Sequence, residues 1–195
     1  MELVFASANQ HKVREINSII GESIKLLGLK DLQITEDIPE EEPTLEGNAL
    51  AKARYVHNLT GRNVFADDTG LEIEALGGQP GVHSARFAGE SKDSAANIEK
   101  VQRLLGDNPN RNARFRTVIA LIMEGEEYLF EGIVSGKIIR EKRGSEGFGY
   151  DPVFIPDGKS RTFAEMDLSE KNTVSHRARA FMKLHDFLSQ LQDRQ

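Results

Sequence analysis

The segment NVFADDTGLEIEAL, residues 63–76, predicts two short strands on either side of a polar turn. The first strand, Asn63 to Ala66, ends in Asp67-Asp68-Thr69-Gly70, and the second is expected around Leu71 to Leu76. Adjacent carboxylates repel each other, and the ends of strands are where α/β enzymes place ligands. Asp67-Asp68 is therefore expected to be either a solvated turn or a site for a magnesium ion, which takes oxygen ligands.

Strands and helices alternate along the chain on both sides of this segment. The elements expected are a strand at Leu3–Ala6, a helix at Gln10–Ile20, a helix capped by Thr44 and running to about Asn58, a helix at Ser94–Leu105, two strands between Phe115 and Ile139, and a last helix opened by Ser175. This alternation predicts an α/β protein with a mixed sheet, folded as one unit over residues 1–195.

The composition limits the classes of protein that the chain can belong to. It has no cysteine, so disulfides, thiolate catalysis and cysteine-bound zinc are excluded. The net charge of -6 argues against a nucleic-acid partner, because such binding depends on many lysines and arginines. No apolar run approaches the roughly 20 residues that span a bilayer, so no membrane partner is expected. A strand directly after Met1 leaves no room for a signal peptide, and a cytoplasmic location is expected.

Ser7-Ala8-Asn9-Gln10-His11-Lys12 joins the first strand to the first helix. Lys12 is expected in the first helical turn, where exposed backbone amides favour an anion and the helix dipole disfavours a cation. A bound phosphate would resolve that conflict, and Ser7 and Asn9 add further polar groups. An ordinary capped helix with one surface lysine explains the same segment, so both interpretations stay open.

Two segments near the C-terminus could contact a nucleobase. Gly147-Phe148-Gly149-Tyr150-Asp151-Pro152 sets aromatic rings between glycines, which suits either a loop that stacks on a planar base or a hairpin turn with a core phenylalanine. Arg177 lies four residues before Phe181, so its head is expected just beyond the buried stripe of the last helix. There it could bond a purine carbonyl or a phosphate, or form an ordinary salt bridge.

Taken together, these motifs resemble the inosine/xanthosine triphosphate pyrophosphatase family over nearly the whole chain. The stretches that carry the resemblance are Ser7–Lys12, Phe65–Leu71, Ala75–Gly81, Gly147–Pro152, Phe163–Met166 and Glu170–Arg177. The resemblance implies an elongated mixed sheet with flanking helices, two lobes around a central cleft, and a homodimer.

The resemblance also implies roles for individual residues. Asp68 matches the catalytic and metal-binding aspartate, and Glu40 the second magnesium ligand, with Glu41 a close competitor because the acidic loop varies in length. The positions that match substrate-binding residues of the family are Ser7, Ala8, Asn9, Gln10, His11, Lys12, Lys52, Thr69, Phe148, Gly149, Tyr150, Asp151, Lys171, His176 and Arg177.

The expected activity is magnesium-dependent hydrolysis of noncanonical purine nucleoside triphosphates (ITP, dITP and XTP) to the monophosphate and pyrophosphate. The small-molecule partner is then a nucleoside triphosphate. Two alternatives remain: a related pyrophosphatase for other modified or pyrimidine nucleotides, which would share the phosphate and metal chemistry, and a nucleotide sensor without turnover.

Overall fold

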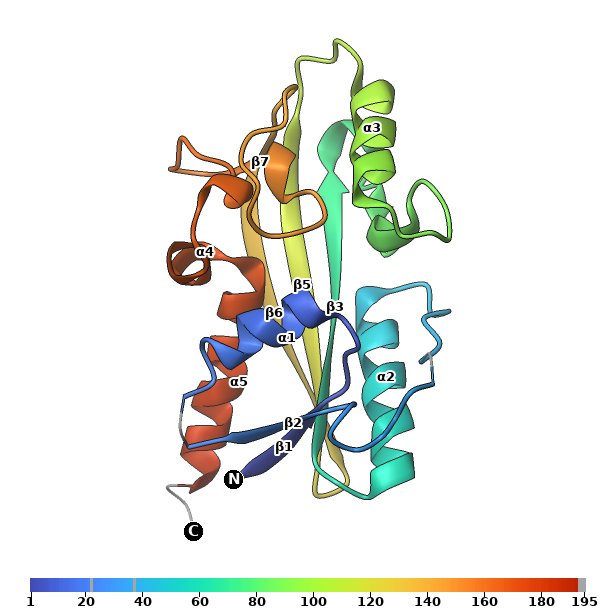
Figure 1. Cartoon of the computed structure of the whole chain (residues 1–195), viewed down its shortest axis with the longest axis vertical. Coiled ribbons are helices and arrows are strands. Elements are labelled where there is room, and N and C mark those ends of the chain that lie inside the picture. Colours follow the sequence, from blue (N-terminus) through green and yellow to red (C-terminus); the bar gives the residue numbers. More distant parts are fainter. Residues whose placement is uncertain (22, 37, 193–195) are drawn as a thin grey trace. The chain divides into compact units, whose positions relative to one another are not determined.

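The computed structural model describes residues 1–21, 23–36 and 38–192 of the chain (Figure 1). Its strands are β1 (Glu2–Phe5), β2 (Lys25–Gly28), β3 (Val64–Ile73), β4 (Pro80–Gly81), β5 (Asn112–Met123), β6 (Glu126–Ile138) and β7 (Phe154–Pro156). Its helices are α1 (Gln10–Asn17), α2 (Leu45–Thr60), α3 (Ser94–Leu105), α4 (Leu168–Val174) and α5 (His176–Gln192).

The strands form a mixed sheet in the order β2-β1-β3-β5-β6-β7, with β4 paired to β3. β1 runs parallel to β2 and to β3, whereas β4 is antiparallel to β3 and β7 is antiparallel to β6. Parallel neighbours require helical crossovers, and antiparallel neighbours can be joined by short turns. The α/β class with a mixed sheet, predicted from the alternation of elements, is confirmed.

The chain divides into two compact units, each with its own core. Unit 1 comprises Met1–Asp68, Thr117–Gly132 and Arg177–Gln195, and unit 2 comprises Thr69–Arg116 and Ile133–His176. The boundaries fall inside β3, β5 and β6, so each of these strands contributes residues to both units.

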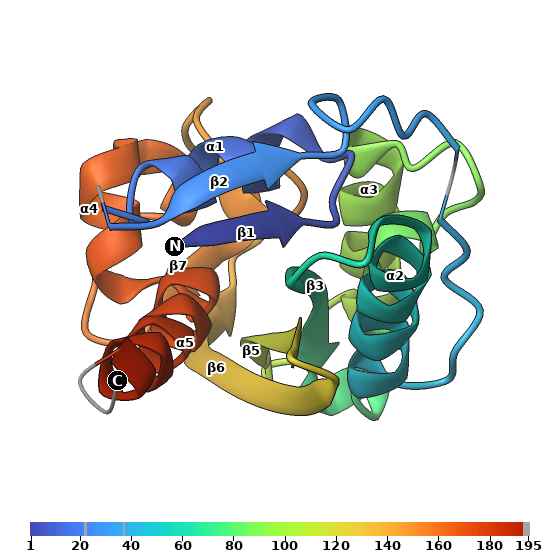
Figure 2. The same ribbon diagram turned by 90° about the horizontal axis from the view of Figure 1, so that it is seen from below.

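The core of unit 1 lies between the sheet and two helices. Leu3 and Phe5 of β1 face this core together with Ile16 of α1 and Phe181 of α5, and Phe5 stacks on Phe65 with ring centroids 4.7 Å apart. Figures 1 and 2 show α1 and α5 on one side of β1 and β3, and α2 on the other. The buried positions of α2 include two small residues, Ala49 and Ala53, both fully buried.

The core of unit 2 is centred on a cluster of phenylalanine rings. The ring of Phe115 lies 4.7 Å from that of Phe154 and 6.0 Å from that of Phe163, and the latter two are 5.3 Å apart. Ile98 and Val101 of α3 pack into the same cluster. Rings at these separations in tilted or edge-on geometry add to the stability given by burial alone.

Local sequence signals correctly predicted most helix starts and the hairpin of β5 and β6. The Asn9 side chain accepts hydrogen bonds from the first turn of α1, Thr44 caps α2, and α3 spans the predicted residues. Glu124 and Gly125 both have positive φ, at 53° and 85°, which is the geometry of a tight turn between β5 and β6. These predictions are confirmed.

Two predictions about element boundaries are wrong, and four short elements were missed. Residues 63–76 do not form two strands around a turn, because β3 runs unbroken from Val64 to Ile73 and carries Asp67 and Asp68 in its interior. α1 ends at Asn17 and not at Ile20, because Ser18 ends it with its hydroxyl bonded to the carbonyl of Glu15. The short elements β2, β4, β7 and α4 were not predicted, since few residues carry their pattern.

The Gly136→Ala variant tests the close approach of β6 and β7. A Cβ at Gly136 would lie 2.2 Å from the carbonyl oxygen of Ile155 and 2.9 Å from Cα of Pro156, and neither backbone atom can move without opening the strand pair. We expect the free energy of unfolding, measured by chemical denaturation, to fall by about 1–3 kcal/mol.

Gly28→Ala in β2 is the matched control, because its Cβ would meet nothing nearer than Asp31 Oδ2 at 3.5 Å, an ordinary contact. Equal stability losses in the two variants would contradict the steric explanation.

Candidate active site

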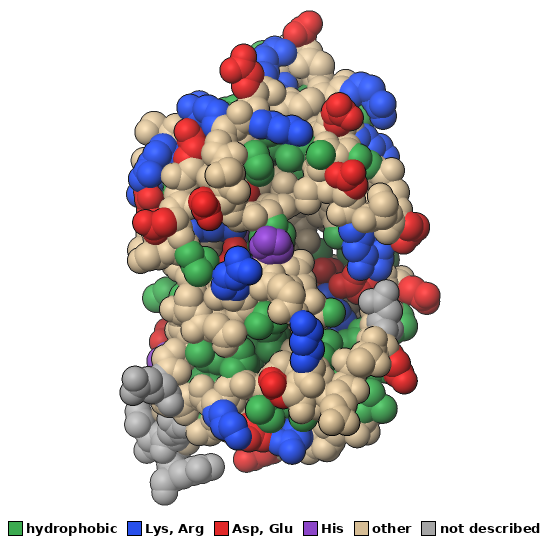
Figure 3. All heavy atoms as spheres, in the orientation of Figure 1, with side chains coloured by type: hydrophobic (Ala, Val, Ile, Leu, Met, Phe, Trp, Pro, Cys, Tyr) green, Lys and Arg blue, Asp and Glu red, His purple; other side chains and the backbone are tan. Residues whose placement is uncertain are grey.

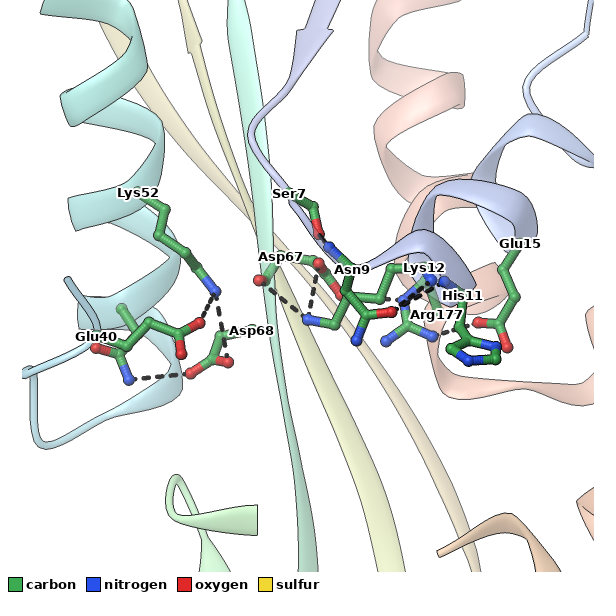
Figure 4. A network of polar contacts seen from close by, with 11 residues as sticks. Ser7, Asn9, His11, Lys12, Glu15, Glu40, Lys52, Asp67, Asp68 and Arg177 are labelled. Carbon is green, nitrogen blue, oxygen red and sulfur yellow. Dashed lines mark hydrogen bonds and ion pairs between the residues drawn. The ribbon is translucent and has the colours of Figure 1, made fainter. Parts of the chain in front are cut away.

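Asp67 and Asp68 occupy the centre of a polar network in unit 1 and point to opposite faces of β3. Successive side chains of a strand alternate between the faces of the sheet. Figure 4 shows Asp67 directed towards Lys12 and Arg177, and Asp68 directed towards Lys52. The two carboxylates therefore have different partners, and their mutual repulsion is relieved by side chains of the protein itself.

Asp67 is the anchor of this network. It is 1% exposed, and its carboxylate accepts hydrogen bonds from Lys12 Nζ at 3.0 Å and Arg177 Nε at 3.0 Å. Burial alone would raise the pKa of Asp67, but the two cations outweigh it and hold the pKa well below its ordinary range. Arg177 is bonded on its other side to Glu15, a buried residue of α1. Asp67 is thus held ionised at neutral pH by its two buried cations.

Asp68 is bonded to an amide and lies near a lysine. It is 8% exposed and accepts a hydrogen bond from Asn48 Nδ2 at 3.1 Å, while Lys52 Nζ lies 3.7 Å from its other oxygen. Burial raises the pKa of Asp68, Glu40 adds to this effect, and the lysines oppose it only in part. A carboxylate with a raised pKa is better suited to accept a proton than the fully paired Asp67.

Lys52 links Asp68 to the acidic loop before α2. Its ammonium group donates to Glu40 Oε1 at 2.7 Å. Burial works against the charge of Lys52, but Asp68 and Glu40 together raise its pKa. The structure therefore brings Glu40 to the Asp68 side of the network, whereas the neighbouring Glu41 is exposed.

The turn between β1 and α1 presents backbone amides beside this network. Asn9 Oδ1 accepts from the backbone nitrogens of His11 and Lys12, and Ser7 Oγ accepts from the nitrogen of Asn9 at 3.3 Å. Ala8, Asn9, Gln10 and His11 are exposed. Lys12 is tied to Asp67 from the first turn of α1, and burial lowers its pKa although Asp67 opposes the effect. In this structure, the carboxylate of Asp67 compensates the unfavourable interaction between Lys12 and the helix dipole.

The predicted base-binding residues of unit 2 form a loop with a buried polar interior. Asp151 is 3% exposed, and its Oδ2 accepts from Lys171 Nζ at 2.6 Å and from the backbone nitrogen of Phe148 at 2.9 Å. Gly147 has φ +73°, and a Cβ there would lie 2.1 Å from Asp151 Oδ2, so the loop closes tightly over the carboxylate. The buried Asp151–Lys171 pair therefore holds the backbone of the loop in place.

The two aromatic residues of this loop have different environments. Tyr150 is 4% exposed, its hydroxyl donates to the carbonyl of Ser84 at 2.7 Å, and burial raises its pKa. Phe148 is half-buried, with Lys171 Nζ 5.2 Å from its ring centroid. Phe148, and not Tyr150, is therefore the ring that a planar ligand can reach.

His176 and Arg177 are both buried at the start of α5. His176 stacks on Phe115 in unit 2, with centroids 4.6 Å apart and planes 14° from parallel. Arg177 is 1% exposed, so the expectation that its head extends beyond the buried stripe is wrong. The guanidinium group lies inside because Asp67 and Glu15 compensate its charge, and together they raise its pKa despite burial.

The structure groups the predicted site residues as two sets. Unit 1 holds Ser7 to Lys12, Glu40, Lys52, Asp68 and Arg177; unit 2 holds Thr69, Phe148 to Asp151, Lys171 and His176. Two members of the network in unit 1, Asn48 and Glu15, were not predicted from the sequence. Asn48 precedes Lys52 by four residues on α2 and Glu15 follows Lys12 by three on α1, so helical spacing from each lysine would have found both.

The donor set beside Asp68 fits a magnesium ion that is shared with a substrate. Among the described residues, no three histidine, cysteine, aspartate or glutamate side chains form a group that could hold a metal by themselves. Asp68 and Glu40 provide two carboxylates with a lysine between them. Magnesium commonly binds through one or two carboxylates and takes its remaining ligands from phosphates and water.

The chain belongs to the Ham1 family, whose model matches residues 3–187. It is 51% identical to the dITP/XTP pyrophosphatase of Flavobacterium johnsoniae, covering 97% of this chain and 98% of that protein. It is 52% identical to the dITP/XTP pyrophosphatase of Porphyromonas gingivalis, covering 96% and 97%. The Ham1 protein of Staphylococcus aureus has a similar structure, with a TM-score of 0.88 at 39% identity over 97% of this chain and 98% of that one. The family resemblance drawn from the motifs is confirmed.

The surface carries charges of both signs. Figure 3 shows acidic and basic side chains interspersed over the face drawn. In the ranges 1–21, 23–36 and 38–192, no helix has the length and apolar character needed to cross a membrane.

The different environments of the two adjacent aspartates predict different effects on stability. Asp67→Asn removes the charge that compensates Lys12 and Arg177, so we expect the free energy of unfolding at neutral pH to fall by about 3–5 kcal/mol. Asp68 has a raised pKa, which means that folding disfavours its ionised form, so Asp68→Asn should change stability by less than about 1 kcal/mol. Urea denaturation of both variants measures the difference, and a larger loss for Asp68→Asn would contradict the assignment of Asp67 as the structural anchor.

Proposed function

We propose that this chain hydrolyses noncanonical purine nucleoside triphosphates, ITP, dITP and XTP, to the monophosphate and pyrophosphate. The observation that carries the proposal is the network in unit 1, where a carboxylate with a raised pKa lies 3.7 Å from a lysine and beside a second carboxylate. This set of groups suits water-mediated attack on a phosphorus atom. Two relatives at 51% and 52% identity bear the name dITP/XTP pyrophosphatase, which supports the substrate class.

Asp68 is the proposed general base and a ligand of magnesium. Asp68 and Glu40 would hold the ion, which when bound supplies positive charge beside the triphosphate and a polarised water. Asp68 would accept the proton of the attacking water at its carboxylate. The bond that breaks joins the α-phosphorus to the oxygen that bridges it to the β-phosphorus, and that oxygen leaves with pyrophosphate.

Cationic and polar side chains are proposed to bind the phosphates. Lys12 and Lys52 place positive charge where negative charge develops on the leaving pyrophosphate, with Lys171 a further candidate. The hydroxyl of Ser7 and the side-chain NH2 of Asn9 offer hydrogen-bond donors to phosphate oxygens. Each of these groups is already held in place by an intramolecular partner, so little ordering is needed when substrate binds.

Base recognition is proposed to combine stacking with hydrogen bonds. Phe148 would stack on the purine, and Thr69 and the backbone of residues 148–151 would contact the nucleoside. His176 and backbone donors would bond the six-oxo group of hypoxanthine or xanthine, where adenine presents an amine. Arg177, buried between Asp67 and Glu15, would act indirectly by holding the network of unit 1 in place. Magnesium dependence and a homodimer belong to the same proposal as expectations from the family resemblance.

Asp68→Asn and Glu40→Gln test the proposed metal and base roles. Loss of a general base lowers rates by about 10²–10⁴, so Asp68→Asn should reduce kcat for ITP at saturating magnesium by at least about 100-fold. Glu40→Gln should raise the magnesium concentration needed for half-maximal activity. Pyrophosphate release measured over a magnesium series gives both quantities.

Glu41→Gln is the matched control for Glu40, since it removes the same charge from the next, exposed residue of the loop. Near-normal kcat in Asp68→Asn would contradict the role of Asp68, and an equal magnesium shift in Glu41→Gln would contradict the choice of Glu40.

The identity of the products tests which phosphorus is attacked. Attack at the α position converts ITP to inosine monophosphate and pyrophosphate, whereas attack at the γ position gives the diphosphate and orthophosphate. We expect monophosphate and pyrophosphate from the earliest time points, separated by ion-exchange chromatography. Early accumulation of the diphosphate would assign the protein to another class of phosphohydrolase, and the absence of turnover with any purine or pyrimidine nucleotide would leave a nucleotide sensor.

A further inference from the structure

We propose that Thr162 is a positioning residue for base binding, because it fixes the loop that presents Phe148. This inference rests on the proposed function, in which Phe148 stacks on the purine. The loop, residues 143–151, is called the ring loop below. Thr162 lies outside it, at the start of the short helical turn Phe163–Glu165, and it is fully buried.

The backbone of the ring loop is bonded to that turn along its first half. The carbonyl of Ala164 accepts hydrogen bonds from the backbone nitrogens of Ser145 and Glu146, both at 3.0 Å. Gly144 has φ +84°, and a Cβ there would lie 2.2 Å from the carbonyl carbon of Ala164. The two backbones are therefore in direct contact, and a shift of the turn must shift the ring loop.

Thr162 fixes the turn to the start of the ring loop. Its hydroxyl donates to the carbonyl of Arg143 at 2.8 Å, and its backbone nitrogen donates to Glu165 Oε2 at 2.8 Å as part of a capping box. The same carboxylate lies 3.5 Å from Arg143 Nε. One buried hydroxyl thus joins the turn to the residue at which the ring loop begins.

The second half of the ring loop is held by the buried Asp151–Lys171 pair and by the bond from Phe148 nitrogen to Asp151. With both halves fixed, the backbone that carries the Phe148 ring is ordered before a ligand arrives. A loop that is ordered only on binding loses conformational freedom at that moment, which weakens binding without changing the chemical step. Thr162 is therefore expected to affect KM and not kcat.

Thr162→Val removes the hydroxyl and keeps the shape of the side chain. We expect the KM for ITP to rise about fivefold, the equivalent of one lost hydrogen bond, with kcat changed less than twofold. Thr162→Ser, which keeps the hydroxyl, should restore a near-normal KM. The inhibition constant of inorganic pyrophosphate, a probe without a base, should be the same in all three proteins.

Thr60→Val is the matched control, since its hydroxyl makes the same kind of bond, to the carbonyl of Val56 at 2.7 Å near the end of α2 in unit 1. It should leave the KM for ITP unchanged. If Thr162→Val does not fold, Glu165→Ala loosens the same turn from its more exposed side and takes its place.

A double-mutant cycle with Phe148→Ala decides whether Thr162 acts through the ring. If it does, the effect of Thr162→Val on KM should largely disappear once the ring is absent. An unchanged KM in Thr162→Val, a fall in kcat instead, or the same KM effect in the Phe148→Ala background would overturn the inference. Failure of the wild-type protein to hydrolyse ITP would instead overturn the proposed function, so the two failures are distinguishable.

Discussion

The buried carboxylate of Asp67 is the interaction on which the arrangement of unit 1 depends. It joins β3 to Lys12 of α1 and to Arg177 of α5, residues that lie 55 and 110 positions away in the chain. A buried charge is strongly unfavourable without a partner, so these helices cannot shift along the sheet without exposing or isolating one of the ions. The start of α1, and with it the turn of backbone amides after β1, takes its position from this constraint.

The same constraint explains why two adjacent aspartates have different chemistry. Asp67 uses both oxygens on two cations that are themselves buried, and its pKa falls. Asp68 faces the other side of β3, where Lys52 is shared with Glu40, and its pKa rises. The two side chains are of the same type, and their pKa values differ because successive residues of a strand point to opposite faces of the sheet. One residue is thereby committed to structure, and the other keeps the capacity to exchange a proton or bind a cation.

Much of the fold followed from local signals, whereas the centre of the site did not. Caps at Asn9 and Thr44 and the turn at Glu124-Gly125 depend on bonds within a few residues, and such signals survive in the sequence. The continuous course of β3 could not be predicted, because two charged residues in a strand interior are unfavourable until cations from α1, α2 and α5 surround them. The burial of Arg177 has the same origin, since its compensation by Glu15 spans 162 positions of the chain. Motif order gave the candidate site residues, but it did not give their partners.

The environments of Phe148 and Tyr150 limit what can determine base selectivity. Tyr150 is bonded to Ser84 and is buried, so in the proposed base site stacking falls to Phe148 and not to Tyr150. Every base has a π-face, and stacking on one ring is therefore tolerant of base identity. Selectivity for a six-oxo purine must come from hydrogen-bond donors, each worth about 1–3 kcal/mol when a mispaired group is buried. One such contact changes the ratio of kcat/KM between two bases by only about one to two powers of ten, so several donors have to act together. A loop with a fixed backbone provides amide donors whose positions do not adjust to the wrong base.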